Sequence, residues 1–191
     1  MRVSREQAAE NHARIVAVAS ALFREKGYDG IGVADIMQAA ELTHGGFYGH
    51  FKSKDDLAAQ ASRDALAKSA AKWETIAATA GDKVFAELVA SYLRRGHCDN
   101  AGKGCALTAL GNDAARQGKP VRTAFREGLM RLVDILATAV PGTKAARRKR
   151  ALAAMAQMVG AVVLARAVDD TALSDEILSA AKQALLASGE A

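Results

Sequence analysis

The sequence contains few residues that interrupt a helix, because only two of its 191 residues are proline. Alanine is abundant, and long stretches show no bias toward β-branched side chains. These features argue against a β-sheet protein and predict an all-α fold. A chain of this length can form either one sizeable core or a small head on a larger body.

Cysteine is also scarce, because Cys98 and Cys105 are the only two and cannot supply a disulfide framework. No apolar stretch near Met1 resembles a signal peptide. The most hydrophobic later segment, 151–167, contains Gln157 and Arg166 and is too short to span a bilayer comfortably. We therefore expect a cytoplasmic protein with reduced thiols and no membrane partner.

The charge of the chain does not identify a partner by itself. The net charge is +5 and the pI is near 9.4, which is compatible with a polyanionic partner. However, the first 60 residues carry seven basic and eight acidic side chains. A DNA-binding role must therefore be inferred from where individual residues lie, and not from bulk charge.

The first 60 residues show the pattern of a helix-turn-helix. Apolar residues at helical spacing predict a long helix from Glu6 that ends at Gly27, followed by a short helix over 33–40. Thr43 is a natural N-cap for a third helix that reaches His50, and Ser53 is one for a fourth. Two short helices joined by a tight turn and braced by a longer helix are the elements of this motif.

The expected third helix has an unusual composition, because it contains Gly45, Gly46 and Gly49. Each glycine costs roughly 0.5–1 kcal/mol relative to alanine inside a helix. A purely structural helix has little reason to accept this cost, whereas a helix that lies close to a DNA backbone benefits from small side chains.

The run Leu42-Thr43-His44-Gly45-Gly46-Phe47-Tyr48-Gly49-His50-Phe51-Lys52-Ser53-Lys54-Asp55-Asp56-Leu57 resembles the recognition-helix signature of TetR-family transcriptional regulators. The positions of Phe23, Gly27, Ile36 and Ala39-Ala40 also match, so the resemblance covers roughly residues 10–57. It implies that Phe47 and Phe51 are core anchors, and that Tyr48 and Lys54 contact phosphates. It further implies a DNA-facing set in which Thr43, His44 and Gly45 face the bases, beside Gly46 and His50.

Two positions depart from the family pattern, because relatives usually carry a hydroxyl near Gly32 and another at Gly46. The operator sequence is therefore not predictable. Two alternatives to DNA binding stay open for the head. Tyr48 and Lys54 could be ordinary surface residues of a helical bundle, and His44 and His50 could be metal ligands, although no second pair lies at suitable spacing.

The resemblance implies a helix-turn-helix domain over 1–52 and a ligand-binding and dimerisation domain over 53–191, with about nine helices in the whole chain. The helices expected after the head cover 53–80, 84–95, 105–116, 120–141, 144–168 and 174–187. In this family the last two helices form an intersubunit four-helix bundle. Here they carry apolar stripes, which could equally be internal core: Leu152, Met155, Val159, Val162 and Leu164, with Ile177, Leu178, Ala181 and Leu185.

The middle helices of the family enclose a ligand cavity. The aromatic and methionine candidates for its lining are Trp73, Phe85, Tyr92, Phe125, Met130, Met155 and Met158. Polar contacts could come from Asn112, Asp113, Arg122 or Gln157. Such apolar residues at helical spacing are also typical of plain core.

Cys105 lies at the predicted start of a helix, after a glycine-rich loop that carries Lys103. Helix N-termini and nearby cations stabilise the reactive thiolate. The Gly-Cys pair is similar to that of the N-ethylmaleimide-responsive branch of the family, which implies a sensing cysteine, with Cys98 able to resolve a sulfenic acid. A small buried residue without this role is the alternative, and a metal site of His97, Cys98 and Cys105 is short of ligands.

We therefore expect a homodimeric transcriptional regulator, most simply a repressor, that binds a pseudo-palindromic operator in double-stranded DNA. A small-molecule inducer or an electrophile of unknown identity would release it. The sequence shows no Ser-His-Asp arrangement, paired catalytic carboxylates, phosphate-binding glycine loop or metal-ligand quartet, so we expect no enzyme, no cofactor and no metal. A structural DNA binder without sequence preference is the rival hypothesis.

Overall fold

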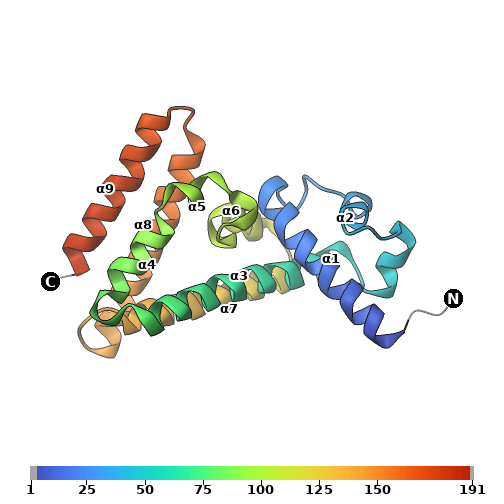
Figure 1. The fold of residues 1–191 in the computed structure, drawn as a ribbon, viewed down its shortest axis with the longest axis horizontal. Helices are drawn as coiled ribbons and strands as arrows, with labels where there is room; N and C mark the ends of the chain where they lie inside the picture. The colour runs from blue at the N-terminus through green and yellow to red at the C-terminus, as the bar shows by residue number, and fades with distance from the viewer. Residues whose placement is uncertain (1–3, 190–191) are drawn as a thin grey trace.

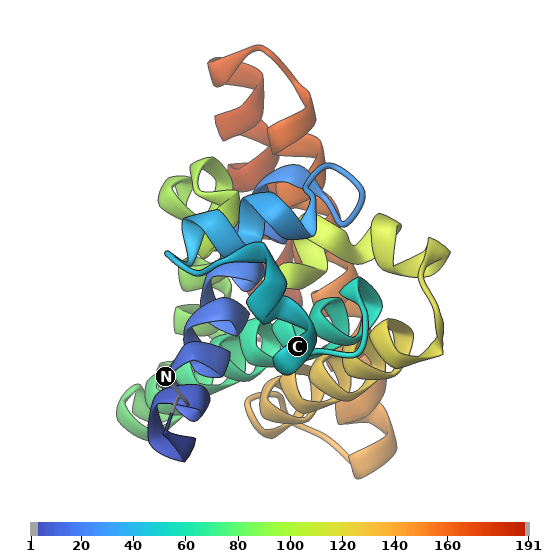
Figure 2. The ribbon, with the colours of Figure 1, turned by 90° about the vertical axis from the view of Figure 1, so that its right-hand side faces the viewer.

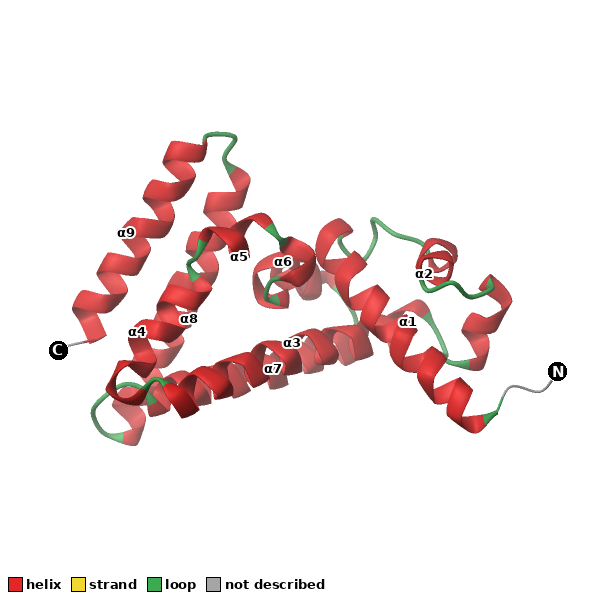
Figure 3. Ribbon diagram, in the orientation of Figure 1, coloured by secondary structure: helices red, strands yellow, loops and turns green. Residues whose placement is uncertain are grey.

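The computed structural model describes residues 4–189 and contains only helices within that range (Figure 3). The predicted all-α fold is therefore confirmed. The α-helices are α1 (Arg5–Lys26), α2 (Val33–Ala39), α3 (Lys54–Thr79), α4 (Val84–Tyr92), α5 (Arg95–Asp99), α6 (Ala106–Arg116), α7 (Lys119–Thr138), α8 (Lys144–Ala167) and α9 (Thr171–Gly189). Three short 3-10 helices complete the set: η1 (His44–Gly49), η2 (Gly81–Lys83) and η3 (Ala101–Lys103).

The molecule divides into a head and a body (Figure 1). The head consists of α1, α2, η1 and the start of α3, and Figure 2 turns it toward the viewer. The body is built on α3 and α7, which run side by side, and on the α8–α9 pair at the far end. The predicted domain boundary at residue 52 precedes the first residue of α3, the helix that runs from head to body.

The long helices begin and end at the residues that local chemistry favours. Gly27 ends α1 with a φ of 77°, a conformation that glycine adopts without strain. The Ser53 hydroxyl accepts the Asp56 amide at 3.1 Å and so caps α3. Pro120 lies in the first turn of α7, where its missing N–H costs nothing.

The third helix of the head differs from the prediction, because 44–49 forms a 3-10 helix and the Thr43 side chain makes no capping hydrogen bond. Glycine has low α-helix propensity, and three of the six residues are glycine. A 3-10 helix of this length needs few consecutive hydrogen bonds, of which His50 N to Phe47 O at 2.9 Å is one.

The segment expected as a glycine-rich loop, 96–104, also differs. The preceding helix ends at Tyr92 rather than at residue 95, and two short helices follow, α5 and η3. Both are held by side chains from distant parts of the chain, so local sequence could not reveal them.

The helix α8 is long and apolar enough to cross a membrane by length and composition, with a mean hydropathy of 1.3 over its best window. The core helix of a globular fold passes the same test, and α8 packs against α7 and α9 while Ala151, Met158 and Val162 are buried. These buried residues belong to the core of the body, and 39% of the apolar window is buried.

Candidate functional site

The 3-10 helix η1 presents one buried and one exposed ring at the surface of the head. Phe47 is buried, whereas the next residue, Tyr48, is 71% exposed and is an exposed large hydrophobic side chain. The two rings meet edge to face, with centroids 5.2 Å apart at 86°. Phe47 thus anchors η1 to the core, as predicted, and Tyr48 projects from the surface of the head.

The support under η1 is a stacked and hydrogen-bonded group of side chains. The His12 ring of α1 stacks on buried Phe51 at 4.6 Å, and its Nε2 lies 2.9 Å from Gln60 Oε1. The Gln60 amide donates to Asp56 Oδ1 at 3.0 Å, and Asp56 Oδ2 accepts the Lys52 amide at 3.1 Å. This series of contacts fixes the position of η1 relative to α1 and α3.

His50 is close to this group, with its ring centroid 6.1 Å from that of His12. Burial and the nearby His12 lower the pKa of His50. A neutral His50 keeps both a donor and an acceptor for a nucleic-acid partner.

The glycines of η1 have room for a side chain. A Cβ atom added at Gly45 or Gly49 would meet nothing within 4 Å, and one at Gly46 would make only ordinary contacts, 3.7 Å from Met37 and Thr43. Packing inside the head therefore does not require these glycines. A close external surface remains a reason for them.

The seven predicted DNA-binding residues lie around η1 and the start of α3. Thr43, His44, Gly45 and Tyr48 are exposed, and Gly46, His50 and Lys54 are partly buried. In the part of the chain that the structure describes, no three His, Cys, Asp or Glu residues lie close enough together to hold a metal ion. The individual DNA contacts remain predictions.

The turn between α2 and η1 is strained at one residue. Glu41 has a φ of 57°, which side chains other than glycine adopt at a cost. The Leu42 amide donates to Met37 O and the Glu41 amide donates to Gln38 O, both at 2.9 Å. These are the two bonds of a Schellman C-cap, and they hold the turn in place.

A second candidate site is a small cavity in the body, here called the Cys105 cavity. Its volume is about 60 Å³, and it lies where α3, α4, η3 and the start of α6 meet. Its lining residues are Ser69, Lys72, Trp73, Ser91, Tyr92, Arg94, His97, Lys103, Gly104, Cys105 and Leu132.

Aromatic rings form one wall of the Cys105 cavity. Tyr92 packs edge to face on both Trp73, at 5.8 Å, and His97, at 4.5 Å. Tyr92 is 3% exposed, and its hydroxyl has no partner with hydrogen-bond geometry. After burial, the neighbouring Cys105 thiol has the largest effect on the Tyr92 pKa. Burial raises the pKa of Tyr92 well above its usual value, so the hydroxyl keeps its proton.

His97 is held in one tautomer by backbone groups. Its Nε2 accepts the Cys105 amide at 2.9 Å, so Nδ1 carries the proton and donates to Tyr92 O at 2.5 Å. Burial lowers the pKa of His97, and the cations Arg166, Arg94 and Lys72 lower it further. The ring is therefore neutral and joins the start of α6 to the end of α4.

Cys105 is the N-cap of α6, the predicted position, and its environment matches the alternative of a small buried residue and not that of a stabilised thiolate. The residue is 5% exposed, and burial raises the pKa of its thiol. The Tyr92 and Ser69 hydroxyls, the Leu107 amide and the Arg24 charge oppose this rise only in part. The resting sulfur is thus a protonated thiol. Cys98 is also a free, buried cysteine but does not line the cavity.

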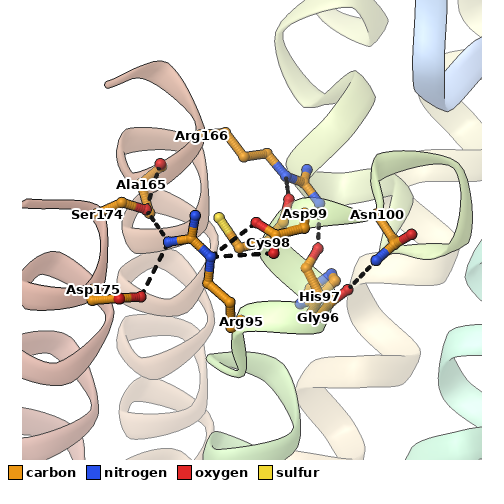
Figure 4. A network of polar contacts seen from close by, with 10 residues as sticks. All are labelled: Arg95, Gly96, His97, Cys98, Asp99, Asn100, Ala165, Arg166, Ser174 and Asp175. Carbon is orange, nitrogen blue, oxygen red and sulfur yellow. Dashed lines mark hydrogen bonds and ion pairs between the residues drawn. The ribbon is translucent and has the colours of Figure 1, made fainter. Parts of the chain in front are cut away.

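The wall of the cavity is tied to the α8–α9 pair by two arginines (Figure 4). Arg166 of α8 donates from Nε to Cys98 O and from a second nitrogen to His97 O, both at 2.7 Å. Arg95 of α5 donates to Ser174 Oγ at 2.9 Å and pairs with Asp175 Oδ1 at 3.1 Å on α9.

The same wall is tied to the head. Arg24 of α1 donates two N–H groups to Gly102 O, the one from Nε at 2.9 Å. Gly102 lies so close to the Glu25 carboxylate that a side chain there would collide with it. A Cβ at Gly27 would lie 2.7 Å from Asp113 of α6, so α1 also rests closely on α6. Residues 97–105 therefore connect the head, the cavity and the α8–α9 pair.

The structure does not bring all the predicted ligand-binding residues together. Trp73 and Tyr92 line the Cys105 cavity, Met130 lines an open groove between α3 and α7, and Phe85 lines a third hollow with Gln157. Phe125, Met155 and Met158 are buried in the core. Asn112 and Arg122 are exposed, and Asp113 pairs with Arg116 at 2.6 Å. The ligand-binding assignment of each remains a prediction.

Sequence analysis missed four polar residues of the cavity. Ser69 and Lys72 come from α3, Ser91 from α4 and Arg94 from the connection to α5. Each looks like an ordinary surface residue of its helix, and only the packing of α3 against α4 brings them to one place.

Comparisons with known proteins agree with this architecture. Residues 15–61 match the family described as bacterial regulatory proteins of the tetR family. The reduced form of NemR from E. coli is similar, with a TM-score of 0.77 and 18% identity over 92% of this chain and 95% of that chain. A TetR transcriptional regulator from Chloroflexus aurantiacus has a TM-score of 0.72 and 26% sequence identity, over 93% of this chain and 95% of that chain. A TetR-family regulator from Agrobacterium tumefaciens has a TM-score of 0.75 and 22% sequence identity, over 92% of this chain and 97% of that chain.

No curated protein matches the sequence.

Proposed function

Because the chain is a member of the TetR family of bacterial transcriptional regulators, we propose that it is a homodimeric repressor whose hold on its operator is controlled from the Cys105 cavity. DNA binding by η1 and a conformational route from the cavity to the head are the two parts of this function. Each part has its own support in the packing of the chain.

The exposed Tyr48 on η1 is the observation that carries the DNA-binding part. A large aromatic side chain that is 71% exposed on a rigidly supported helix has no role in the core. Its hydroxyl suits a phosphate oxygen, and the ammonium group of Lys54, the first residue of α3, suits one as well. With Thr43, His44 and Gly45 exposed beside them, backbone and base contacts are available together.

Dimerisation through α8 and α9 is supported by an unpartnered apolar face. Besides Tyr48, the exposed large hydrophobic residues of the described chain are Leu152, Val163, Leu164 and Leu173, and all four lie on these two helices. Other members of the predicted stripes, such as Met155 and Leu178, are internal core. A second copy would cover the exposed residues and place two heads on two half-sites.

Control from the Cys105 cavity is supported by the connections of its wall. Arg24 of the head donates a hydrogen bond to the Gly102 carbonyl. Arg166 of α8 donates hydrogen bonds to the His97 and Cys98 carbonyls. Anything that enlarges the cavity must move residues between these two attachments. Such a movement changes the angle between head and dimer interface, which sets the separation of the two η1 helices.

Selection of tight binders from a random DNA pool tests the DNA-binding part. The expected product is a pseudo-palindrome with half-sites about one helical turn apart, bound at least about a thousandfold more tightly than random DNA. A matched Tyr48→Phe variant should select the same sequence with lower affinity. Equal affinity for every sequence would instead show a structural DNA binder and contradict the proposed function.

A further inference from the structure

Three cations and no carboxylate line the Cys105 cavity. Lys72 comes from α3, Arg94 precedes α5 and Lys103 ends η3, so three separate segments direct positive charge to one place. None of the three forms an ion pair or a side-chain hydrogen bond within residues 4–189. An arrangement of this kind attracts a negatively charged ligand.

The floor of the cavity holds a buried donor without an acceptor. The Tyr92 hydroxyl is almost completely buried and has no hydrogen-bond partner. Buried polar groups in folded proteins are nearly always paired, so an orphan in a cavity wall points to a ligand or water that pairs with it. Because the hydroxyl keeps its proton, an acceptor is its natural complement.

Apart from the Cys105 sulfur, whose pKa the Tyr92 hydroxyl lowers, the hydrogen-bonded ring of His97 does not compete for this donor. The Nε2 lone pair of His97 already accepts the Cys105 amide, and its Nδ1–H is given to Tyr92 O. The Cys105 sulfur is a neutral thiol, which neither repels an anion nor neutralises the surrounding cations. Besides the Ser69 and Ser91 hydroxyls, which can donate or accept, the unsatisfied capacity of the site consists of donors and positive charge.

From this geometry we infer that the Cys105 cavity binds a small oxyanion, held between the three cations and the Tyr92 hydroxyl. A volume of about 60 Å³ has room for roughly five non-hydrogen atoms, given about 10–15 Å³ for one water. Formate, acetate and sulfate satisfy this limit. The role of this anion as the effector rests on the regulatory function proposed above.

The single tryptophan of the chain is a built-in probe, because Trp73 lines the cavity. Formate, acetate or sulfate would be added to the purified full-length protein, with sodium gluconate keeping the ionic strength constant. Saturable change in Trp73 emission is expected for at least one of these oxyanions. Acetamide, which has the size of acetate but no charge, should cause no change at equal concentration.

Variants connect the signal to the proposed contacts. Lys72→Gln and Tyr92→Phe should each raise the dissociation constant by about tenfold or more, since each removes one hydrogen bond to a charged ligand. Lys68→Gln is the matched control, because Lys68 lies one turn earlier on α3 and is already paired with Asp64 at 2.7 Å. Its dissociation constant should match that of the wild type.

The possible results separate cleanly. Saturation by carboxylates alone, by sulfate alone or by both supports the site and identifies the kind of oxyanion. Equal responses to acetate and acetamide, a response that only follows total salt, or equal constants in all variants would overturn it. The DNA selection described above is independent, so a protein that binds acetate but no specific DNA would refute the proposed function and leave the anion site intact.

Discussion

Replacement of His97 tests the link between α4 and α6 most sharply. In His97→Gln the side-chain carbonyl can still accept the Cys105 amide, but the Nδ1–H bond to Tyr92 O and the ring contact with Tyr92 are lost. The lost hydrogen bond is worth about 1 kcal/mol, and the edge-to-face contact about 0.5–1.5 kcal/mol. We therefore expect the free energy of unfolding to fall by about 2 kcal/mol at pH 7.5.

The difference in the free energy of unfolding between wild type and His97→Gln should also depend on pH. Because the pKa of His97 is lowered in the folded protein, the unfolded chain binds a proton first as the pH falls. The stabilising effect of a neutral His97 is therefore complete above its ordinary pKa of about 6.5 and is lost below it. Between pH 7.5 and 5.5 the wild type should lose up to about 1.4 kcal/mol that His97→Gln does not lose.

Urea denaturation at a series of pH values measures both effects, with exposed His44→Gln as the control for loss of one histidine. The gap between wild type and His97→Gln should narrow as the pH falls from 7.5 to 5.5. A gap that stays constant over this range, or that widens, would refute the assignment of His97 as a neutral ring held by two backbone groups.

Four further predictions concern the head. Tyr48→Phe should lower the affinity for operator and for random DNA alike by about three- to tenfold in anisotropy titrations. Lys54→Gln should reduce the slope of log affinity against log salt concentration by about one. An altered base preference in either variant would contradict a phosphate contact. Glu41→Gly should raise the free energy of unfolding by about 0.5–1 kcal/mol in urea, because φ is 57° there, and a loss would show that its side chain has a role. Arg24→Gln should lower the free energy of unfolding by about 1.5–3 kcal/mol, because two bonds to Gly102 O are lost, and an unchanged midpoint would show that this link is unimportant.

The helices that begin or end at a local signal were predictable from the sequence. Ser53, Gly27 and Pro120 act through neighbouring residues, so the ends of α3, α1 and α7 were found to within about two residues. The buried roles of Phe47 and Phe51 were also predicted, because the resemblance fixed them residue by residue.

Features that depend on contacts between distant segments were not predictable. The short helix α5 is stabilised by Arg166, which lies 68 residues beyond Cys98 in the chain. A helix start and a nearby lysine left a stabilised Cys105 thiolate open as one alternative, yet burial has the larger effect on its pKa and raises it. Lys72 and Arg94 gave no signal at all, because each becomes part of a site only when α3 and α4 pack together.

Operator binding before and after modification of Cys105 tests the central claim most directly. Fluorescence anisotropy on the DNA upstream of the gene would compare wild type, Cys105→Ser and Cys98→Ser, each with and without methyl methanethiosulfonate, which adds only a small S–CH₃ group to a thiol. Wild type and Cys98→Ser should bind tightly and be released by the reagent, whereas Cys105→Ser should bind tightly and stay bound. Release of Cys105→Ser to the same extent as the wild type, or a wild type that never binds a specific sequence, would contradict control of DNA binding from this cavity.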